Sequence, residues 1–426
     1  MLISAALPIL LLSHLGLCAA TALTNRQESS PRSYDHDHGQ GKRSLKKCVV
    51  KAQNDGTDDA PAIRQAFDIC GHNGNVIFEN TTYHINSPLT TTDLFDCRVD
   101  IFGTLLWSND TSYWLNNSMP VGYQNQSTVW FLGGEGLSVY GHGYGTFDGN
   151  GQAWYDLVKG ESNYPNRPMA LAIWGAKDSV FKGLRFVQAQ MWTATIMHSS
   201  NLLLEDIYVN NTSRNRNPAR NTDGANTIYS DNITFRRWQV YNGDDAIALK
   251  ANSTNILVEN LVSHDGNGFS LGSIGQYKGE VETIENVTVR DVVFENTKYA
   301  TRIKTWTGEQ VGYPPNGGGG GLGYLSNFTA TNIRETPIFF TQCITYNGVT
   351  GNCSSSPFKI SDFTATNYRG TSQSSYIGRL QCSRAAGGCD GIRIEDIELL
   401  NTAVEPPIQA SRWSCSNVVE PVGFAC

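Results

Sequence analysis

Residues 253–266 read STNILVENLVSHDG, and this pattern decides the fold because it recurs along the second half of the chain. Each copy has a polar or small pair, then alternating apolar residues, then a polar end. Further copies begin at Ser200, Ser230, Ile284, Leu325, Ile360 and Cys389, and weaker ones at Glu135 and Lys177. The matched asparagines lie 31, 23, 31 and 41 residues apart; they are Asn201, Asn232, Asn255, Asn286 and Asn327. Self-similarity at a spacing of roughly 20–50 residues indicates a solenoid or an array.

The pattern inside each copy predicts strands rather than helices. Apolar and polar residues alternate, β-branched residues are frequent, and no helical period is present. A short strand cannot bury its apolar face alone, but a stack of identical rungs buries it. We therefore predict an all-β fold, a parallel β-helix. A β-propeller is the alternative, and it is disfavoured because each copy provides too few strands.

The segment from Asn54 to Cys70 predicts a short N-terminal capping helix. Thr57 or Asp58 can cap its N-terminus, and Pro61 falls in the first turn. Apolar residues recur on one face; they are Ile63, Ala66, Phe67 and Cys70. Such a helix would cover the open end of the first rung, where exposed strand edges otherwise invite aggregation.

The N-terminus predicts export. Residues 1–22 resemble a signal peptide, with an apolar stretch too short for a membrane span and a cleavage site of small residues at Ala20–Ala22. Residues 23–47 form a polar leader with a dibasic Lys42-Arg43, which makes it a propeptide candidate, and residues 48–426 remain as the β-helix domain. We expect a secreted, extracellular monomer without a membrane anchor.

The cysteines and sequons agree with an oxidising compartment. None of the nine cysteines after the leader shows the C-x-x-C spacing of a zinc site. Close spacing suggests the pairs Cys343–Cys353, Cys382–Cys389, Cys415–Cys426 and Cys48–Cys70, which leaves Cys97 unpaired, although spacing does not fix connectivity. Glycosylation sequons are frequent, and they include Asn80, Asn109, Asn125, Asn232, Asn252, Asn286, Asn327 and Asn352.

The net charge of −7 and the pI near 5.6 argue against a nucleic-acid partner. They leave an acidic polysaccharide open, because recognition of one sugar carboxylate needs only a local basic cluster.

Several acids are placed at the spacing of one rung. Asp223 lies 21 and 22 residues before Asp244 and Asp245, and Asn267 lies 22 residues after Asp245. If one turn takes about that many residues, these side chains stack on neighbouring rungs roughly 4.8 Å apart. Three such carboxylates repel one another, which raises at least one pKa. A carboxyl that stays protonated beside ionised partners is what glycoside hydrolysis requires.

Arg302 and Lys304 lie two residues apart in one predicted strand, so they point to the same face and can pair with a sugar carboxylate. Each feature alone has a plainer explanation. An Asp at a β-helix turn usually satisfies backbone groups, and two basic residues are usually a solvated face. Their combination favours a functional site.

These motifs resemble those of the fungal polygalacturonase-type family of pectin hydrolases, from Asp55 to the C-terminus. N-T-D, G-D-D, G-x-G and R-I-K occur in the family's order, at residues 221–223, 243–245, 266–268 and 302–304. Supporting marks are GTFDGNGQAWY at 145–155, Arg167-Pro168 and GSIGQY at 272–277. The resemblance implies a single-stranded, right-handed parallel β-helix of the pectin-lyase type. It also implies hydrolysis of pectic polysaccharide with inversion, without a metal or other cofactor.

The resemblance also implies roles for the site residues. Asp244 would be the general acid, while Asp223 and Asp245 would activate the attacking water. Arg302 and Lys304 would bind the carboxylate of galacturonate. Inversion requires room for a water between acid and base, roughly 6.5–9.5 Å.

One position departs from the family, which has G-H-G where this chain has Gly266-Asn267-Gly268. Asn267 cannot titrate, so we assign it to substrate binding, and it leaves the substrate subclass open. His264 is close in sequence, but an offset of three along a strand points to the opposite face.

Three long segments predict loops that turn a groove into a pocket; they are Met119–Val129, Thr307–Leu322 and Tyr346–Pro357. A pocket binds chain ends, so the sequence most resembles the exo-acting branch, which releases terminal galacturonic acid as a galacturan 1,4-alpha-galacturonidase does. An exo-acting rhamnogalacturonan hydrolase or alpha-L-rhamnosidase is the alternative. A polysaccharide lyase, which needs Ca²⁺ and a base, and an inactive wall-binding protein are disfavoured.

Overall fold

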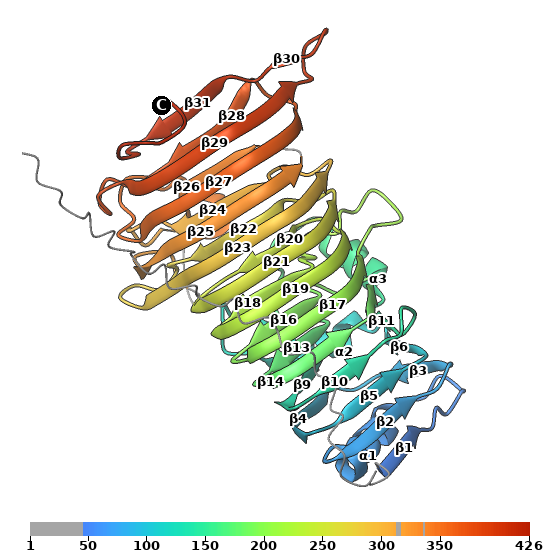
Figure 1. The fold of residues 1–426 in the computed structure, drawn as a ribbon. Coiled ribbons are helices and arrows are strands. Elements are labelled where there is room, and N and C mark those ends of the chain that lie inside the picture. Colours follow the sequence, from blue (N-terminus) through green and yellow to red (C-terminus); the bar gives the residue numbers. More distant parts are fainter. Residues whose placement is uncertain (1–45, 312–316, 335–336) are drawn as a thin grey trace, which may run out of the picture. The chain divides into compact units, whose positions relative to one another are not determined.

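The sequence repeats form strands that pair in parallel, one above the next, in the computed structural model, which describes residues 46–311, 317–334 and 337–426. Figure 1 shows the rungs following one another from the N-terminal strands in blue to the C-terminal strands in red. The first ladder contains β1 (Lys46–Val50), β2 (Gly74–Phe78), β5 (Arg98–Ile101), β10 (Ser138–Tyr140), β14 (Lys177–Lys182), β17 (Ser200–Asn210), β19 (Ser230–Tyr241), β21 (Ser253–His264), β23 (Val281–Glu295), β25 (Leu322–Arg334), β27 (Lys359–Ser372) and β29 (Cys389–Asn401). The predicted right-handed parallel β-helix is confirmed.

Two further ladders complete each turn. The second begins with β3 (Thr82–Ile85), β6 (Thr104–Trp107), β11 (Thr146–Asp148) and β15 (Arg185–Val187). The third contains β4 (Leu89–Phe95), β9 (Trp130–Glu135), β13 (Leu171–Trp174), β16 (Ala194–Met197), β18 (Ala225–Ile228), β20 (Asp245–Leu249), β22 (Gly268–Ile274), β24 (Thr301–Trp306), β26 (Ile338–Ile344), β28 (Tyr376–Gln381) and β31 (Arg412–Ser416). Two short pieces lie outside the ladders: β7 (Met119–Pro120), β8 (Ser127–Thr128) and β12 (Pro168–Met169) form a small sheet, and β30 (Ile408–Gln409) pairs antiparallel with β29.

The repeats form longer strands than the short ones that the sequence predicted. β17 pairs with β14 through its first half and with β15 through its second, so one continuous strand serves two ladders. Each long strand bends at a residue in the left-handed region, which turns the chain without ending the pairing. These residues have φ between 54° and 57°, and they are Asp206, Arg237, Asn260, Asp291 and Asn332.

A second left-handed position near the start of each long strand is held by an asparagine ladder. Asn232 Nδ2 donates to Asn201 Oδ1 at 2.9 Å. Asn286 donates in the same way to Asn255 at 3.1 Å, and Asn327 donates to Asn286 at 2.6 Å. Asparagine tolerates this backbone region and its amide both donates and accepts, which explains why the repeat carries it.

The core consists of apolar side chains that stack from rung to rung. In the first ladder Phe235, Val258 and Val289 lie in register and are at most 1% exposed. Near the N-terminus the rings of Trp107 and Phe147 stack with centroids 6.0 Å apart. Because stacked strands pack like residues against one another, the repeat alone specifies this core.

Ionic side chains of alternating sign follow the outer face of the first ladder across five successive rungs. Lys182, Glu205, Arg236, Glu259 and Arg290 occupy matching register positions on β14, β17, β19, β21 and β23. Both carboxylates are 9% exposed, and each is paired on both sides at 2.5–3.5 Å. Burial alone would raise the pKa of Glu205 and Glu259, but the hydrogen bonds and charges of the basic partners hold it below its ordinary value.

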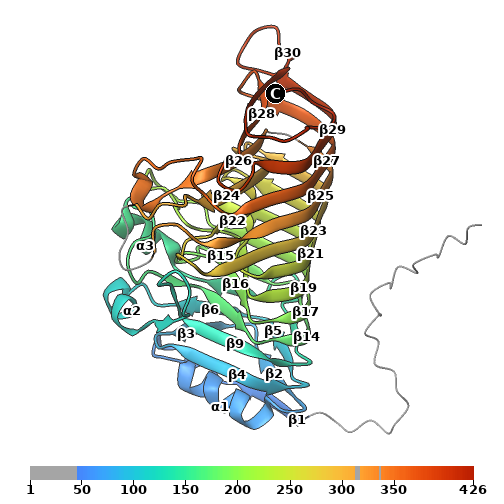
Figure 2. The same cartoon turned by 90° about the vertical axis from the view of Figure 1, so that its left-hand side faces the viewer.

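The N-terminal helix α1 (Ala60–Cys70) buries the predicted face, with Ile63, Phe67 and Cys70 at most 4% exposed. The predicted cap was wrong, because the N-cap is Asp59. The carboxylate of Asp59 instead accepts from the backbone N–H groups of Gln53 and His84, which ties the helix to the first rungs. Figure 2 places α2 (Thr111–Asn117) and α3 (Gly151–Val158) on the opposite edge from the long strands; a 3₁₀ helix, η1, spans Tyr346–Gly348.

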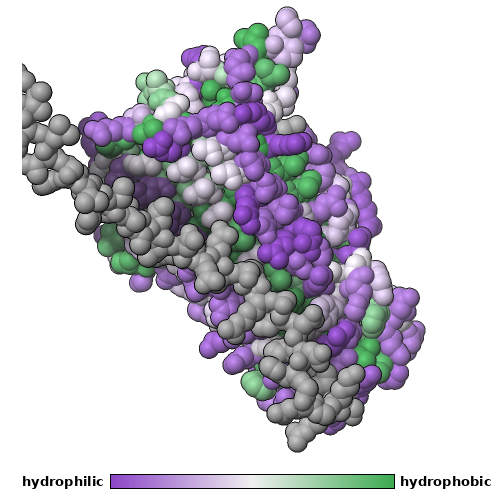
Figure 3. Space-filling model, viewed as in Figure 1, coloured by the Kyte–Doolittle hydropathy of each residue, from purple (hydrophilic) through white to green (hydrophobic). Residues whose placement is uncertain are grey.

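The four suggested disulfides are all present, namely Cys48–Cys70, Cys343–Cys353, Cys382–Cys389 and Cys415–Cys426. Cys97 is buried and free, as expected. The signal peptide and most of the polar leader lie outside the described residues, so those boundaries stay predictions. No helix among the described residues is long and apolar enough to cross a bilayer. Figure 3 shows a mainly hydrophilic face, with hydrophobic residues in small separated groups.

Candidate active site

Asp223 and Asp245 lie on adjacent rungs, as the sequence spacing predicted. Asp245 is the first residue of β20, and Asp223 lies two residues before β18. Ala225 pairs with Ile247, which is a spacing of 22 residues. The N–H of Gly224 donates to the Asp245 carbonyl at 3.0 Å, which fixes the two acids side by side.

Asp244 is held by three N–H donors. One carboxylate oxygen accepts from the Asn267 amide at 2.8 Å and from the Asp245 N–H at 3.0 Å, and the other accepts from the Asn221 N–H at 3.1 Å. These three contacts fix the orientation of the Asp244 side chain beside the cavity. The register differs by one residue from the prediction. Asp245 faces Gly268, so Asn267 lies beside Asp244, because the pairing of β20 with β22 shifts after Asp245.

Asp245 is held as an anion by a cation two rungs away. Its carboxylate accepts from the Lys304 ammonium at 2.5 Å and from the Ser270 hydroxyl at 2.6 Å, and Asp245 is 1% exposed. Burial alone would raise the pKa of Asp245. The charges of Lys304 and Arg302 and the two hydrogen bonds outweigh burial and lower it.

Asp223 has the opposite environment. It is 3% exposed, and its Oδ1 has no hydrogen-bond partner among the described residues. Burial, and then the charges of Asp244 and Asp245, raise the pKa of Asp223 well above its ordinary value. Among the three acids Asp223 therefore favours the protonated form, and the expectation that crowding raises at least one pKa is met at this residue.

Arg302 and Lys304 reach the same cavity from β24, as their spacing predicted. The Arg302 guanidinium lies 5.1 Å from the centre of the Tyr299 ring, an arrangement that orients it over an aromatic face. The Lys304 ammonium already has Asp245 as a partner, whereas the sequence assigned Lys304 only to the sugar.

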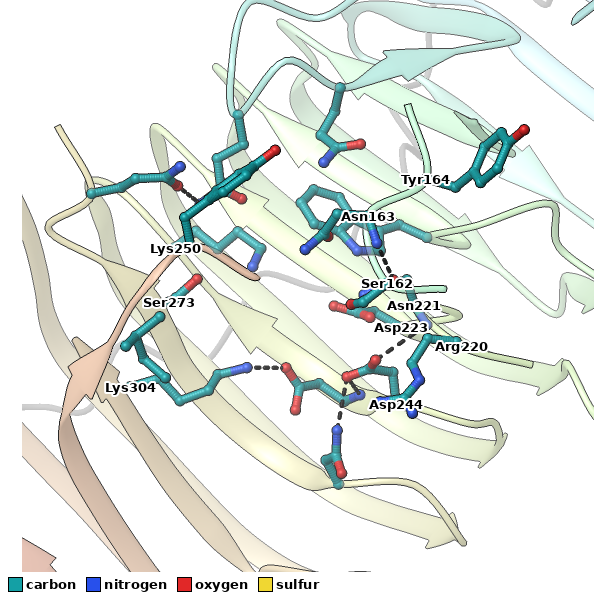
Figure 4. A pocket seen from close by; sticks show the side chains of 18 of the residues that line it. Ser162, Asn163, Tyr164, Arg220, Asn221, Asp223, Asp244, Lys250, Ser273 and Lys304 are labelled. Carbon is teal, nitrogen blue, oxygen red and sulfur yellow. Dashed lines mark hydrogen bonds and ion pairs between the residues drawn. The ribbon is translucent and has the colours of Figure 1, made fainter. Parts of the chain in front are cut away.

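These side chains line a cavity of about 390 Å³, which is walled by loops from distant parts of the chain. The amide of Gln124, in the predicted first loop, donates to Gln276 at 2.8 Å and so joins two distant segments of the cavity lining. Another segment lies against the catalytic motif, where the Asn163 N–H donates to the Asn221 side chain at 2.9 Å. In Figure 4 Asp223, Asp244, Lys250 and Lys304 point into one space. Tyr346 of the predicted third loop also lines it, while residues 312–316 of the second loop lie outside the described residues.

The family follows from a comparison with known proteins. Residues 91–426 match the family described as glycosyl hydrolases family 28. The chain belongs to this family. It is a glycoside hydrolase, which decides against the lyase and the inactive wall-binding alternatives.

Among relatives of this family 28 hydrolase, the Alpha-L-rhamnosidase rgxB of Aspergillus niger is 52% identical over 388 residues, with 89% of each chain covered. The Exopolygalacturonase of Cochliobolus carbonum is 38% identical over 383 residues, which cover 87% of this chain and 84% of that protein. The crystal structure of an endo-xylogalacturonan hydrolase from Aspergillus tubingensis aligns with a TM-score of 0.73 at 25% identity, covering 89% of this chain and 98% of that one.

His264 does not take the place of the family's histidine. Its Nδ1 lies 2.8 Å from Glu295, and its ring stacks on Tyr241 at 4.0 Å. His264 is also absent from the cavity lining, as the strand geometry predicted. In this family 28 hydrolase the partner of Asp244 at that position is the uncharged amide of Asn267.

Sequence reasoning missed Lys250 and Trp192, which both line the cavity. The rung spacing could have found them. Trp192 precedes Asp223 by 31 residues and Lys250 precedes Gly272 by 22, the same intervals that relate other stacked positions. Arg167, previously noted only as a supporting mark, is 1% exposed and donates to the Arg220 carbonyl at 2.9 Å, so it braces the loop before Asn221.

The raised pKa of Asp223 predicts that this acid destabilises the fold at neutral pH. Below an ordinary Asp pKa of about 4 the group is protonated in both the folded and unfolded states, so it has no effect. Above that value only the unfolded chain ionises freely, so the stability of the fold falls as pH rises towards the folded-state pKa. Asp223→Asn should therefore raise the thermal midpoint at pH 7 and leave it unchanged near pH 3.5. An equal or lower midpoint for the variant at pH 7 would contradict this assignment.

Proposed function

We propose that this hydrolase releases terminal galacturonic acid from the non-reducing end of polygalacturonate and pectic oligosaccharides, as an exo-polygalacturonase. The observation that carries the proposal is a cavity whose lining segments are joined by Gln124 and Gln276, with three carboxyl groups and several cations on its walls. We propose that the joined segments limit the cavity to the end of a chain. The cations complement a substrate that carries one carboxylate on each sugar.

The three acids supply the chemistry of inversion. Asp244 donates a proton to the leaving oxygen, while Asp223 and Asp245 activate the attacking water. Lys304 holds Asp245 ionised, Asp244 accepts hydrogen bonds from three N–H groups, and burial favours the protonated form of Asp223. Only one of Asp223 and Asp245 has to be ionised to accept the proton of the attacking water, and Asp245 is the acid that its partners hold ionised.

The remaining predicted site residues contact the sugar. Arg302 binds a carboxylate through its planar fork, and Lys304 keeps Asp245 ionised beside the sugar. Asn267, whose amide holds Asp244, can also bond a hydroxyl. No metal or other cofactor takes part in the proposed reaction. We propose further that the enzyme is a secreted, glycosylated monomer, on the basis of its N-terminal sequence and sequons.

Hydrolysis of a terminal rhamnose is the second candidate. The specific observation in its favour is the 52% identity with a protein named as an alpha-L-rhamnosidase. Asn267 is compatible with it, because an amide bonds a neutral sugar without demanding a charge. The two candidates share the fold, the three acids and the direction of attack, and they differ in the terminal sugar that the cavity holds.

Product analysis decides between the two candidates. Trigalacturonate and a rhamnose-ended rhamnogalacturonan oligosaccharide are incubated with the enzyme, and early products are followed by proton NMR. We expect free galacturonate from the first substrate, initially as the β-anomer, because the acid and the two water-activating carboxylates leave no role for an enzyme nucleophile. Free rhamnose from the second substrate, with trigalacturonate intact, would establish the second candidate. An α-anomer as the first product would overturn the inverting mechanism.

A further inference from the structure

We infer that Lys250 binds the carboxylate of the terminal sugar and thereby sets the preference for an acidic chain end; this inference rests on the proposed function. Lys250 follows β20 directly and is 4% exposed. Its ammonium lies 4.7 Å from the centre of the Trp192 ring, and it has no hydrogen-bond or ion-pair partner among the described residues. The ammonium itself is not fully enclosed but reaches the cavity, where a ligand carboxylate can pair with it.

The position of Lys250 fits the end of a chain. If the register of β20 and β22 continues by one residue beyond Leu249 and Leu271, Lys250 faces Gly272, and Gly272 pairs with Lys304. Gly272 is required by the close approach of the backbone; its φ is +106°, and a Cβ would meet the Lys304 carbonyl oxygen at 2.1 Å, so no side chain projects from this position between the two lysines. Gln276, which accepts the hydrogen bond of Gln124, lies two residues after the end of β22, and Lys250 follows the end of β20. A terminal sugar that stops at this hydrogen bond would meet Lys250.

Arg302 and Lys304, two of the other cations of the cavity, are engaged at the acids. Lys304 is paired with Asp245 at 2.5 Å. Arg302 pairs in register with Ser270, which itself donates to Asp245, so Arg302 lies beside the acids. Burial, and then the charge of Lys304, lower the pKa of Lys250, while the charges of Asp223, Asp245 and Asp244 oppose this shift. A ligand carboxylate would act in the same direction as these acids and favour the charged lysine.

The test compares wild type with Lys250→Met on two trigalacturonates that differ only in a methyl ester on the non-reducing terminal carboxyl. We expect kcat/KM of Lys250→Met to fall about 10- to 100-fold on the free acid, the loss of one charge-assisted hydrogen bond, and to change little on the ester. Lys177→Met, on the exposed side of β14, removes a charge far from the cavity and should match wild type. A Lys250→Met variant that keeps the wild-type ratio of acid to ester would overturn the inference.

A binding measurement separates the loss of a specific contact from misfolding of the variant. Lys250→Gln retains a polar side chain, and inhibition by galacturonate is compared with inhibition by galactose. We expect the variant to lose the wild-type preference for galacturonate; an unchanged preference would again overturn the inference. Failure of the proposed function looks different, because wild type itself would then leave trigalacturonate intact. If wild type cleaves it and Lys250 has no effect, only the inference on Lys250 fails.

Discussion

Asp244→Asn is expected to lower kcat by about 10²- to 10⁴-fold, the usual loss when a general acid is removed. The substitution keeps the shape of the side chain. An amide oxygen can still accept from Asn267 and from the Asp245 N–H, but the new NH₂ would face the N–H of Asn221. We therefore expect a small loss of stability and a large loss of turnover. KM for trigalacturonate should change little, because the proton is needed in the transition state and not for binding.

Asp390→Asn is the matched control for this variant. Asp390 is an exposed residue of β29, and its substitution removes the same charge outside the cavity. Its kcat should equal that of wild type. Near wild-type turnover in Asp244→Asn would instead transfer the role of proton donor to Asp223, whose raised pKa makes it the other candidate.

Lys304→Met is expected to lower turnover by a similar factor through a different route. Without Lys304, the buried carboxyl of Asp245 loses its ion pair and takes up a proton, so it can no longer activate water. Removing one partner of a buried pair also destabilises a fold by about 3–5 kcal/mol. This destabilisation should be largest at neutral pH and should shrink as pH falls, because a protonated Asp245 needs no counter-ion.

Two measurements separate this explanation from a merely structural one. The rate of Lys304→Met should recover as pH rises through the new pKa of Asp245, and it should fall equally on acid-ended and ester-ended substrates. The double variant Lys304→Met/Asp245→Asn should regain thermal stability but not activity. If Lys304→Met loses activity only on the acid-ended substrate, the ammonium acts on the sugar, as the sequence suggested, and not through Asp245.

The sequence predicted the structural features that depend on the repeat. The rungs and the stacking of Asp223 against Asp245 follow from spacing, because a β-helix converts a fixed interval in sequence into adjacency in space. The shared face of Arg302 and Lys304 follows from the two-residue period of a strand. The prediction for Asn267 was wrong by one residue, because the spacing of the motifs does not reveal a local shift in strand pairing.

The features that the sequence did not predict depend on contacts between segments that share no repeat spacing. The hydrogen bond between Gln124 and Gln276 joins residues 152 positions apart, and no pattern in either segment predicts it. The sequence predicts Lys304 as a substrate ligand, because it shows that a cation is present but not that Asp245 is its partner. The charge states of the acids likewise depend on burial: Asp223 and Asp245 are equally hidden, and only their partners give them pKa shifts of opposite direction.

The alternating ionic side chains on the outer face of the first ladder have a consequence for how the chain finds its order during folding. Every rung offers nearly the same apolar surface, so a strand could dock one position too far along the stack without losing much hydrophobic burial. That misplacement would set the buried carboxylates of Glu205 and Glu259 against each other, or Arg236 against Arg290, and like charges repel. The alternation of charge therefore disfavours displacement of a strand by an odd number of rungs, but it does not disfavour displacement by two rungs. Displacement by two rungs is opposed by the unequal intervals of 31, 23, 31 and 41 residues between the repeats, because a connecting segment of one length does not fit a gap of another length.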